Sequence, residues 1–243
     1  MPDNTADPLA RLVALEGVGS AMAAARDGID VLLRDRGLRR STPDLTAESL
    51  LRGAQASAEL EGSAATLEEL RAGGGDPVAH AAVRVSAELL GLAPVLRRSP
   101  LQALARLHTL AGKGQVNGDD LGRPRDARAA ERLAALAGLL TSESAAPALV
   151  LAAVAHAEIA TVAPFVSHNG IVARAVERLV LVARGVDPTS LTVPEAGHLR
   201  LRREYESNLR GYRDGGPAGL HSWLLYAAEA YAAGAEASPL AAR

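Results

Sequence analysis

Apolar residues recur along the chain every three to four positions, which is the spacing of one helix face. No segment of useful length shows the strict apolar–polar alternation that a half-buried strand requires. The pattern therefore predicts an all-α protein. After a short tail over residues 1–7, the expected helices cover residues 8–35 as one long helix or two short ones, then 44–61, 66–71, 77–91, 100–110, 127–140, 145–162, 169–184, 194–213 and 220–237.

Local signals support several of these boundaries. Residues 76–77, Asp-Pro, offer an N-cap followed by proline at the first helical position. Residues 99–102, Ser-Pro-Leu-Gln, have the spacing of a capping box. Three glycines at 73–75 indicate a flexible break. Residues 111–126 are rich in Gly, Asp, Lys and Arg, which predicts a long polar loop or a weak hairpin.

Composition narrows how these helices pack. The chain has 243 residues, enough for one large domain or two small ones, and 48% are apolar but only 2% aromatic. All of the aromatic residues lie at or after Phe165. The preceding two thirds must therefore pack through Ala, Leu and Val, which favours close contact between helices.

Charge and cysteine content exclude several classes of protein. The formal net charge is -2 with acids and bases interspersed, so no nucleic-acid partner is expected. The lack of cysteine excludes disulfide scaffolds and thiolate metal sites. Asp3, Asp7 and Glu16 argue against a secretory signal, and the apolar run 145–157 is shorter than the ~20 residues of a membrane span. We therefore expect a cytoplasmic protein with no membrane partner.

The most informative stretch is residues 163–174, called the signature segment below. Phe165, the only phenylalanine, lies in a Pro-Phe turn, and Asn169-Gly170 then opens an apolar-periodic helix. The unpaired N–H groups at a helix start, together with the helix dipole, can hold an anion, and Arg174 lies one turn further on. The same residues also suit an ordinary helix start with a surface arginine, which the local sequence alone favours.

A resemblance changes this interpretation. The segment resembles the signature His-Pro-Phe-x-Asp/Glu-Gly-Asn-Gly-Arg-x-x-Arg of the Fic, or Fido-domain, family. Aligned without gaps, the matching residues are Pro164, Phe165, Asn169, Gly170 and Arg174.

Features outside the segment agree with the same family. His156 lies where the preceding family helix often carries a histidine, and residues 57–62 are similar to the inhibitory motif Ser/Thr-x-x-x-Glu-Gly/Asn. Tyr205, Tyr212 and the Trp223–Tyr226 region are similar to the family's Tyr-rich helix and Trp-containing last helix. The resemblance extends from about residue 45 to 235.

The resemblance implies a Fic-like helical bundle with a central helix-loop-helix signature. It also allows a short β-hairpin flap in residues 113–125, although Pro124 would interrupt strand pairing. The expected organisation is an N-terminal helical extension over residues 1–43, followed by one compact Fido-like domain over 44–240. That domain includes the inhibitory-type helix 44–62.

The signature segment departs from the family at positions that carry its chemistry. Ala163 stands where the family has its catalytic base, and a methyl group cannot accept a proton; general-base catalysis contributes about 10²–10⁴-fold. Ser167 replaces the acid that holds Mg²⁺, which usually needs one or two carboxylates. His168 replaces a glycine and Ile171 the first arginine. ATP and Mg²⁺, which the resemblance implies as cofactors, are therefore in doubt.

Other features of the resemblance concern single residues. In the family the motif glutamate pairs with the second signature arginine, which predicts Glu61 with Arg174 and places Ser57 in the motif; otherwise Glu61 merely ends an exposed helix. His168 is the candidate for a displaced base, and His156, two helical turns before the signature segment, is the other histidine considered for that role; either could instead be a packed or solvent-facing histidine. We expect no metal site, because no His/Asp/Glu cluster with ligand spacing accompanies His156 or His168.

The sequence thus predicts a catalytically impaired Fido-domain protein, a pseudo-AMP-transferase that acts by binding a protein partner, a nucleotide or another anion at Asn169, Gly170 and Arg174. The alternative is a divergent protein adenylyltransferase, or a related phosphate-linked transferase, with a displaced base. A third reading is an interaction module with no ligand. Apolar stripes on the first helix would suit a homodimer.

Overall fold

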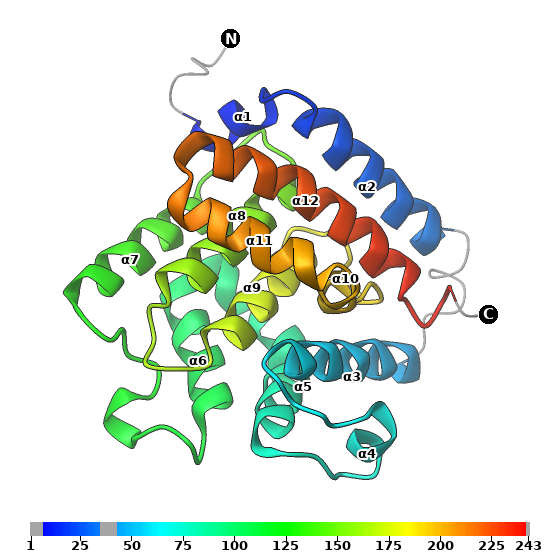
Figure 1. Ribbon diagram of the computed structural model, residues 1–243, viewed down its shortest axis with the longest axis vertical. Coiled ribbons are helices and arrows are strands. Elements are labelled where there is room, and N and C mark those ends of the chain that lie inside the picture. The colour runs from blue at the N-terminus through cyan, green and yellow to red at the C-terminus, as the bar shows by residue number, and fades with distance from the viewer. Residues whose placement is uncertain (1–6, 35–42, 242–243) are drawn as a thin grey trace.

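Helices form all the regular structure of the described residues, 7–34 and 43–241, in a computed structural model (Figure 1). The helices are α1 (Pro8–Val13), α2 (Val18–Leu32), α3 (Pro43–Leu60), α4 (Leu67–Arg71), α5 (Pro77–Arg98), α6 (Pro100–Gly112), the 3₁₀ helix η2 (Gly118–Asp120), α7 (Ala127–Thr141), α8 (Ala148–Val162), α9 (Asn169–Ala183), α10 (Pro194–Arg200), α11 (Arg202–Asp214) and α12 (Gly216–Glu236). The predicted all-α class is confirmed.

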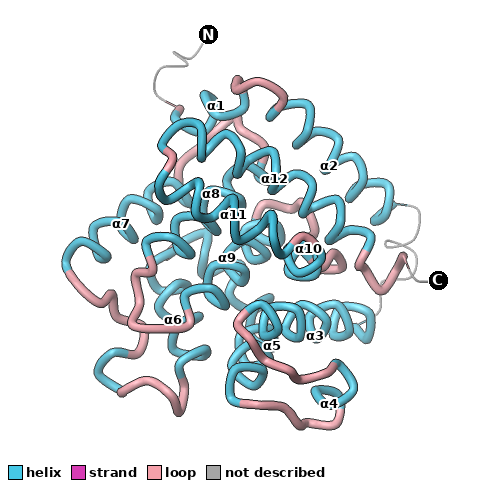
Figure 2. Tube along the Cα trace, in the orientation of Figure 1, coloured by secondary structure: helices cyan, strands magenta, loops and turns pink. Residues whose placement is uncertain are grey.

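Helices α8 and α9 form the centre of the fold and pack along each other. Helix α8 is mostly apolar, and ten of its side chains, from Leu149 to Ile159, are buried. Helices α5 and α6 contact α9, α11 and α12 contact α8, and α2 lies along α12 (Figure 2). Buried alanines from most of these helices share one core, which fits the close helix contacts expected from the composition.

Helix α3 reaches the centre from another direction. It packs along α5 and α10 and also contacts α9, so residues near 57–61 and 169–174 come together although they are far apart in the sequence. This contact positions the candidate site.

Several boundaries differ from the sequence prediction. Helix α5 passes through Gly91 and Pro94 to Arg98, because Leu92, Ala93 and Leu96 continue its buried face. The helix expected over 194–213 is two helices that meet at Leu201. The residue before α6, Ser99, makes no side-chain cap hydrogen bond, so the predicted capping box does not form.

The segment 113–126 contains turns and η2, and the described residues include no strand, so no hairpin flap is seen. The described part of the helical segment predicted from residue 8 onward forms two helices, α1 and α2, separated by a turn in which Gly17 has φ 76°. Residues 1–6 of the predicted tail, and 35–42 of the predicted N-terminal extension, lie outside the described residues.

By length and composition, α5 is the one helix of the described part that would be able to cross a membrane. It packs here against α3, α6 and α9.

Candidate functional site

The loop between α8 and α9 is closed by its own side chains. The Asn169 Oδ1 accepts the Phe165 N–H at 2.9 Å, and Asn169 Nδ2 donates to the Phe165 carbonyl at 2.9 Å. Ala163 and His168, at the two ends of the loop, have left-handed φ values of 47° and 58°. His168 thus adopts a conformation that favours glycine, the residue of the family signature at this position. Asn169 shapes the loop rather than offering its side chain to a ligand.

Arg174 lies 1% exposed on α9 and points toward α3. Its Nε donates to Ser57 Oγ at 2.9 Å, Nη1 to the Tyr205 hydroxyl at 3.1 Å, and Nη2 to the Ser57 carbonyl at 3.0 Å. Nη2 also donates to Glu61 Oε1 at 2.7 Å. The structure therefore brings together Ser57, Glu61 and Arg174, and it adds Tyr205, which was not predicted to belong to the site.

The Glu61 carboxylate occupies the start of α9. A Cβ atom added to Gly170 would lie 2.0 Å from Glu61 Oε1, so the carboxylate fits only because residue 170 is glycine. The Glu61 side chain keeps 33% exposure, whereas Arg174 is almost fully buried. The carboxylate of Glu61 thus lies at the start of α9, where the helix dipole favours a negative charge, and it accepts a hydrogen bond from Arg174.

The other signature positions do not fit Mg²⁺. Ser167 offers a neutral hydroxyl that bonds His168 Nδ1 at 2.6 Å, and Ile171 is a buried apolar side chain. No residue of the loop 163–168 carries a carboxylate. Mg²⁺ in proteins is usually bound through carboxylates and substrate phosphates, so a hydroxyl and an apolar side chain are poor ligands for it.

His168 is the titratable group of the loop. Partial burial lowers its pKa, the nearby Glu61 carboxylate opposes this shift, and Arg84 adds to it. The imidazole is therefore a neutral proton acceptor at neutral pH, one residue before the helix start that Glu61 occupies.

Beyond Arg174 the hydrogen bonds continue into the core. The Tyr205 hydroxyl lies 2.9 Å from His156 Nε2, and His156 Nδ1 lies 3.0 Å from Glu177 Oε2. His198 Nε2 contacts the same carboxylate oxygen at 2.8 Å. Glu177 and His198 were missed in the sequence: Glu177 is a charged side chain in the mostly apolar helix α9, which is a usable signal, whereas His198 lies in a polar stretch and has no such signal.

Arg178, one turn after Arg174, anchors α9 to its neighbours. Its guanidinium donates to Glu195 Oε2 at 2.9 Å, Ser49 Oγ at 2.6 Å, Ser190 Oγ at 2.7 Å and the Thr192 carbonyl at 2.9 Å. These groups belong to α3, to the segment before α10 and to α10 itself. The anchor fixes how α3, which carries Ser57, docks on α9.

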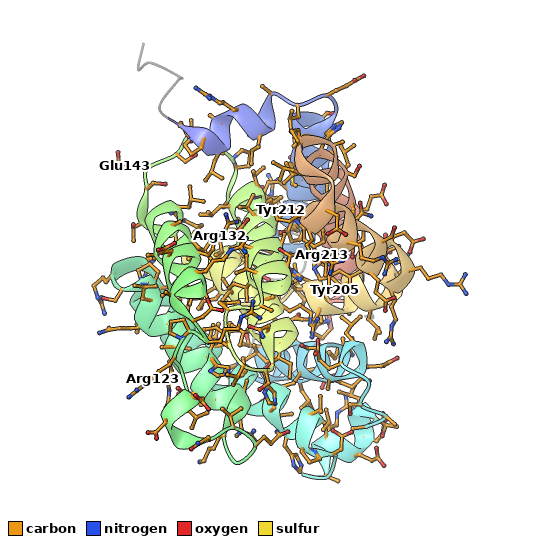
Figure 3. The ribbon with its side chains drawn as sticks, turned by 60° about the vertical axis from the view of Figure 1, so that its left-hand side comes forward. Arg123, Arg132, Glu143, Tyr205, Tyr212 and Arg213 are labelled. Carbon is orange, nitrogen blue, oxygen red and sulfur yellow. The ribbon has the colours of Figure 1, made fainter. Side chains whose placement is uncertain are left out.

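A cavity of about 350 Å³ lies beside the end of α8. It is lined by Arg125, Asp126, Arg128, Ala129, Arg132, Glu158, Thr161, Val162, Tyr212 and Arg213. Figure 3 labels Arg132, Tyr212 and Arg213 of this wall. The Arg125 N–H donates to the Pro164 carbonyl at 2.8 Å, so the cavity adjoins the signature segment, but its lining does not include the start of α9.

His108 packs against the loop between α8 and α9, and its burial predicts how the stability of the protein depends on pH. It is fully buried, stacks on Phe165 with ring centroids 4.3 Å apart, and accepts the Gly122 N–H on Nδ1. Burial, aided by His168, lowers its pKa to about 4 from 6.5. The unfolded chain then binds more protons, so the stability that His108 contributes is complete above pH 6.5 and lost as pH falls toward 4.

We expect the free energy of unfolding to fall by about 1–3 kcal/mol for this residue across that window, with His156 adding in the same direction. Urea titrations at several pH values measure it. His108→Asn should flatten the slope and the exposed control His80→Asn should not. An unchanged slope in His108→Asn would contradict the assignment.

Comparisons with known proteins agree on the fold. A crystal structure of a Fic family protein from Desulfovibrio desulfuricans G20 is similar at 20% identity, with a TM-score of 0.75, over 92% of this chain and 74% of that one. Fic-1 from C. elegans is similar at 18% identity and a TM-score of 0.66, over 90% of this chain and 71% of that one. No protein-family model and no curated protein matches the sequence. The helical arrangement and these structural matches show that the chain has the Fic fold.

Proposed function

We propose that this chain is a Fido-domain pseudo-AMP-transferase that acts by binding and not by transfer. The ligand class is a phosphate-bearing molecule, such as a nucleotide, that takes the place of the Glu61 carboxylate at the start of α9. The observation that carries the proposal is the position of that carboxylate, which lies against Gly170 and accepts a hydrogen bond from Arg174. A phosphate group there would receive the same guanidinium and the free N–H groups of the first turn.

The same geometry argues against transfer. The side chain at position 163 is a methyl group, so the family's base is missing, and that loss alone removes about 10²–10⁴-fold in rate. The loop also lacks the carboxylate through which Mg²⁺ would join a nucleotide to the protein. The protein would act in the cytoplasm. A protein partner would bind differently to the ligand-bound and the ligand-free form.

Removing the carboxylate should strengthen ligand binding. We expect Glu61→Ala to raise the affinity for ATP about tenfold or more, because Arg174 then lacks its anionic partner and the ligand no longer has to displace one. Isothermal titration calorimetry, with and without Mg²⁺, measures the change. We expect Mg²⁺ to add little, since the loop supplies it no carboxylate.

Glu59→Ala is the matched control. Glu59 lies two residues earlier, in the last turn of α3, and its carboxylate accepts a hydrogen bond from Gln55 instead of from Arg174. An equal affinity gain in both variants, or no ATP binding by Glu61→Ala at all, would remove the proposed site.

One observation favours the alternative, a divergent adenylyltransferase. His168 holds a neutral imidazole next to Glu61 and is able to take the proton of a target hydroxyl while its oxygen attacks the α-phosphorus and pyrophosphate leaves. Incubation with α-labelled ATP and cell lysate distinguishes the two functions. We expect no protein labelling; label that disappears in His168→Ala would establish the alternative and overturn the binding-only proposal.

A further inference from the structure

Three side chains from three central helices meet in the core below Arg174. His156 of α8, Glu177 of α9 and His198 of α10 are each 0% exposed. Glu177 Oε2 lies 3.0 Å from His156 Nδ1 and 2.8 Å from His198 Nε2, and all the facing ligand atoms lie within 4.8 Å of one another. The cluster is separate from the start of α9, where the Glu61 carboxylate lies.

The charge of Glu177 lacks a guanidinium partner. Of the other buried carboxylates in residues 7–34 and 43–241, Glu195 pairs with Arg178, and Asp187 accepts hydrogen bonds from Leu191 N and from Thr192 N and Oγ1. The ion-pair contacts of Glu177 are imidazoles instead. A carboxylate removed from water is costly unless a positive charge accompanies it.

Two atoms of the cluster are also left without hydrogen bonds. His156 Nδ1 and Glu177 Oε1 are buried, and neither makes a hydrogen bond of acceptable geometry, although His156 Nδ1 lies 3.0 Å from Glu177 Oε2. The remaining ring nitrogens are occupied, because His156 Nε2 contacts the Tyr205 hydroxyl at 2.9 Å and His198 Nδ1 contacts the Tyr226 hydroxyl at 2.7 Å. Metal-binding histidines are typically oriented in this way, by a polar group on the nitrogen that does not face the metal.

We infer that His156, Glu177 and His198 form a structural binding site for one divalent transition-metal ion of the Zn²⁺ type. Two imidazoles and a carboxylate suit Zn²⁺, whereas Mg²⁺ and Ca²⁺ take oxygen ligands. The second carboxylate oxygen, Glu177 Oε1, is available as the fourth ligand. With bonds of about 2.0–2.1 Å, ligand atoms lie about 3.3 Å apart, close to the two shorter separations; the two nitrogens must approach each other to complete the site.

Full burial makes the site structural, because no open position remains for a substrate. The ion would supply the positive charge that Glu177 lacks and would join α8, α9 and α10. The ion would also hold His156 in place, and His156 contacts the Tyr205 hydroxyl that accepts a hydrogen bond from Arg174.

The test measures the metal directly and needs no nucleotide, so it is independent of the proposed function. The chain, without an affinity tag, is unfolded in the presence of chelator, refolded with Zn²⁺, desalted and analysed by inductively coupled plasma mass spectrometry. We expect about one zinc ion per wild-type chain and under about a tenth of that in Glu177→Gln. The control His80→Gln, which alters an exposed histidine, should keep about one ion.

Thermal unfolding gives a second readout. Zn²⁺ at about 100 times its dissociation constant should raise the melting temperature of the wild type by about 5–10 °C and leave that of Glu177→Gln unchanged. Wild-type protein that refolds without stoichiometric zinc overturns the inference, whether or not the variant folds. Equal zinc content in wild type and in Glu177→Gln or His198→Asn also overturns it, since the metal would then lie elsewhere.

Discussion

Arg174→Ala is expected to lower the free energy of unfolding by about 3–5 kcal/mol, or the melting temperature by about 6–20 °C. The guanidinium is 1% exposed, and its loss leaves the Ser57 carbonyl and hydroxyl without their donor and opens a cavity between α3 and α9. Tyr205 keeps its contact with His156, and Glu61 is exposed enough to reach water, so these two groups add less. Chemical denaturation and calorimetry measure the loss.

The control for this variant is Arg106→Ala. Arg106 binds Glu88 at 2.7 Å, but both side chains are nearly half exposed, so their pair is worth about 0–1 kcal/mol. An equal cost for the two variants would mean that burial of Arg174 contributes nothing, and that its hydrogen bonds with Ser57 and Glu61 do not stabilise the packing of α3 on α9.

A double-mutant cycle isolates the ion pair itself. Glu61→Ala alone should cost about 1–2 kcal/mol, less than a fully buried partner would, because a third of the carboxylate side chain is exposed. In the double variant the losses should fall short of their sum by about 0.5–3 kcal/mol, since each single change already removes the shared contact. Strict additivity would show that the 2.7 Å contact is not a stabilising pair.

More of the fold was predictable from the sequence than the local helix signals alone would suggest. Periodicity predicted the helical class and nearly all the helices, and the signature residues Pro164, Phe165 and Asn169 led to the Fic fold. Boundaries were weaker, because apolar spacing runs on across Leu201, where α10 and α11 meet, and stays regular past Gly91 within α5. Local propensity cannot separate these two cases, since packing by distant helices decides them.

The site was only partly accessible from sequence. Ser57, Glu61 and Arg174 entered through a motif resemblance, and the structure places them in contact. The buried partners Glu177 and His198 had no motif, and their contacts join positions 21 residues apart on different helices. A charged side chain in a mostly apolar helix marks Glu177, but the polar stretch around His198 carries no such signal, and only the fold shows that the two side chains meet.

These contacts indicate how a ligand would enter. The Glu61 side chain is the exposed member of its pair, and it follows the last turn of α3. The rest of α3 is tied to α9 by Ser57 and, two turns earlier, by Ser49, whose hydroxyl accepts from Arg178 at 2.6 Å. A ligand that needs only the position of the Glu61 carboxylate would therefore displace one side chain while α3 stays docked.

Arg178→Met tests whether α3 stays docked on α9 when the ligand binds. The change leaves Glu195, which is 3% exposed, without its partner and removes donors from Ser190 and Thr192, so we expect a loss of about 3–5 kcal/mol in unfolding free energy. Arg200→Met, which breaks an exposed pair with Glu236, should cost about 0–1 kcal/mol.

Arg178→Met also distinguishes two ways in which a ligand would reach the start of α9: displacement of the Glu61 side chain alone, or release of the whole of α3. If ligand entry required release of all of α3, Arg178→Met would weaken the docking of that helix and raise ATP affinity as Glu61→Ala does. We expect calorimetry on the folded variant to give the wild-type affinity, because Arg178 holds the segment near Ser49 while the Glu61 carboxylate still fills the start of α9. A gain equal to that of Glu61→Ala would show that the helix moves, and that the anchor at Arg178, rather than the carboxylate alone, keeps the site closed.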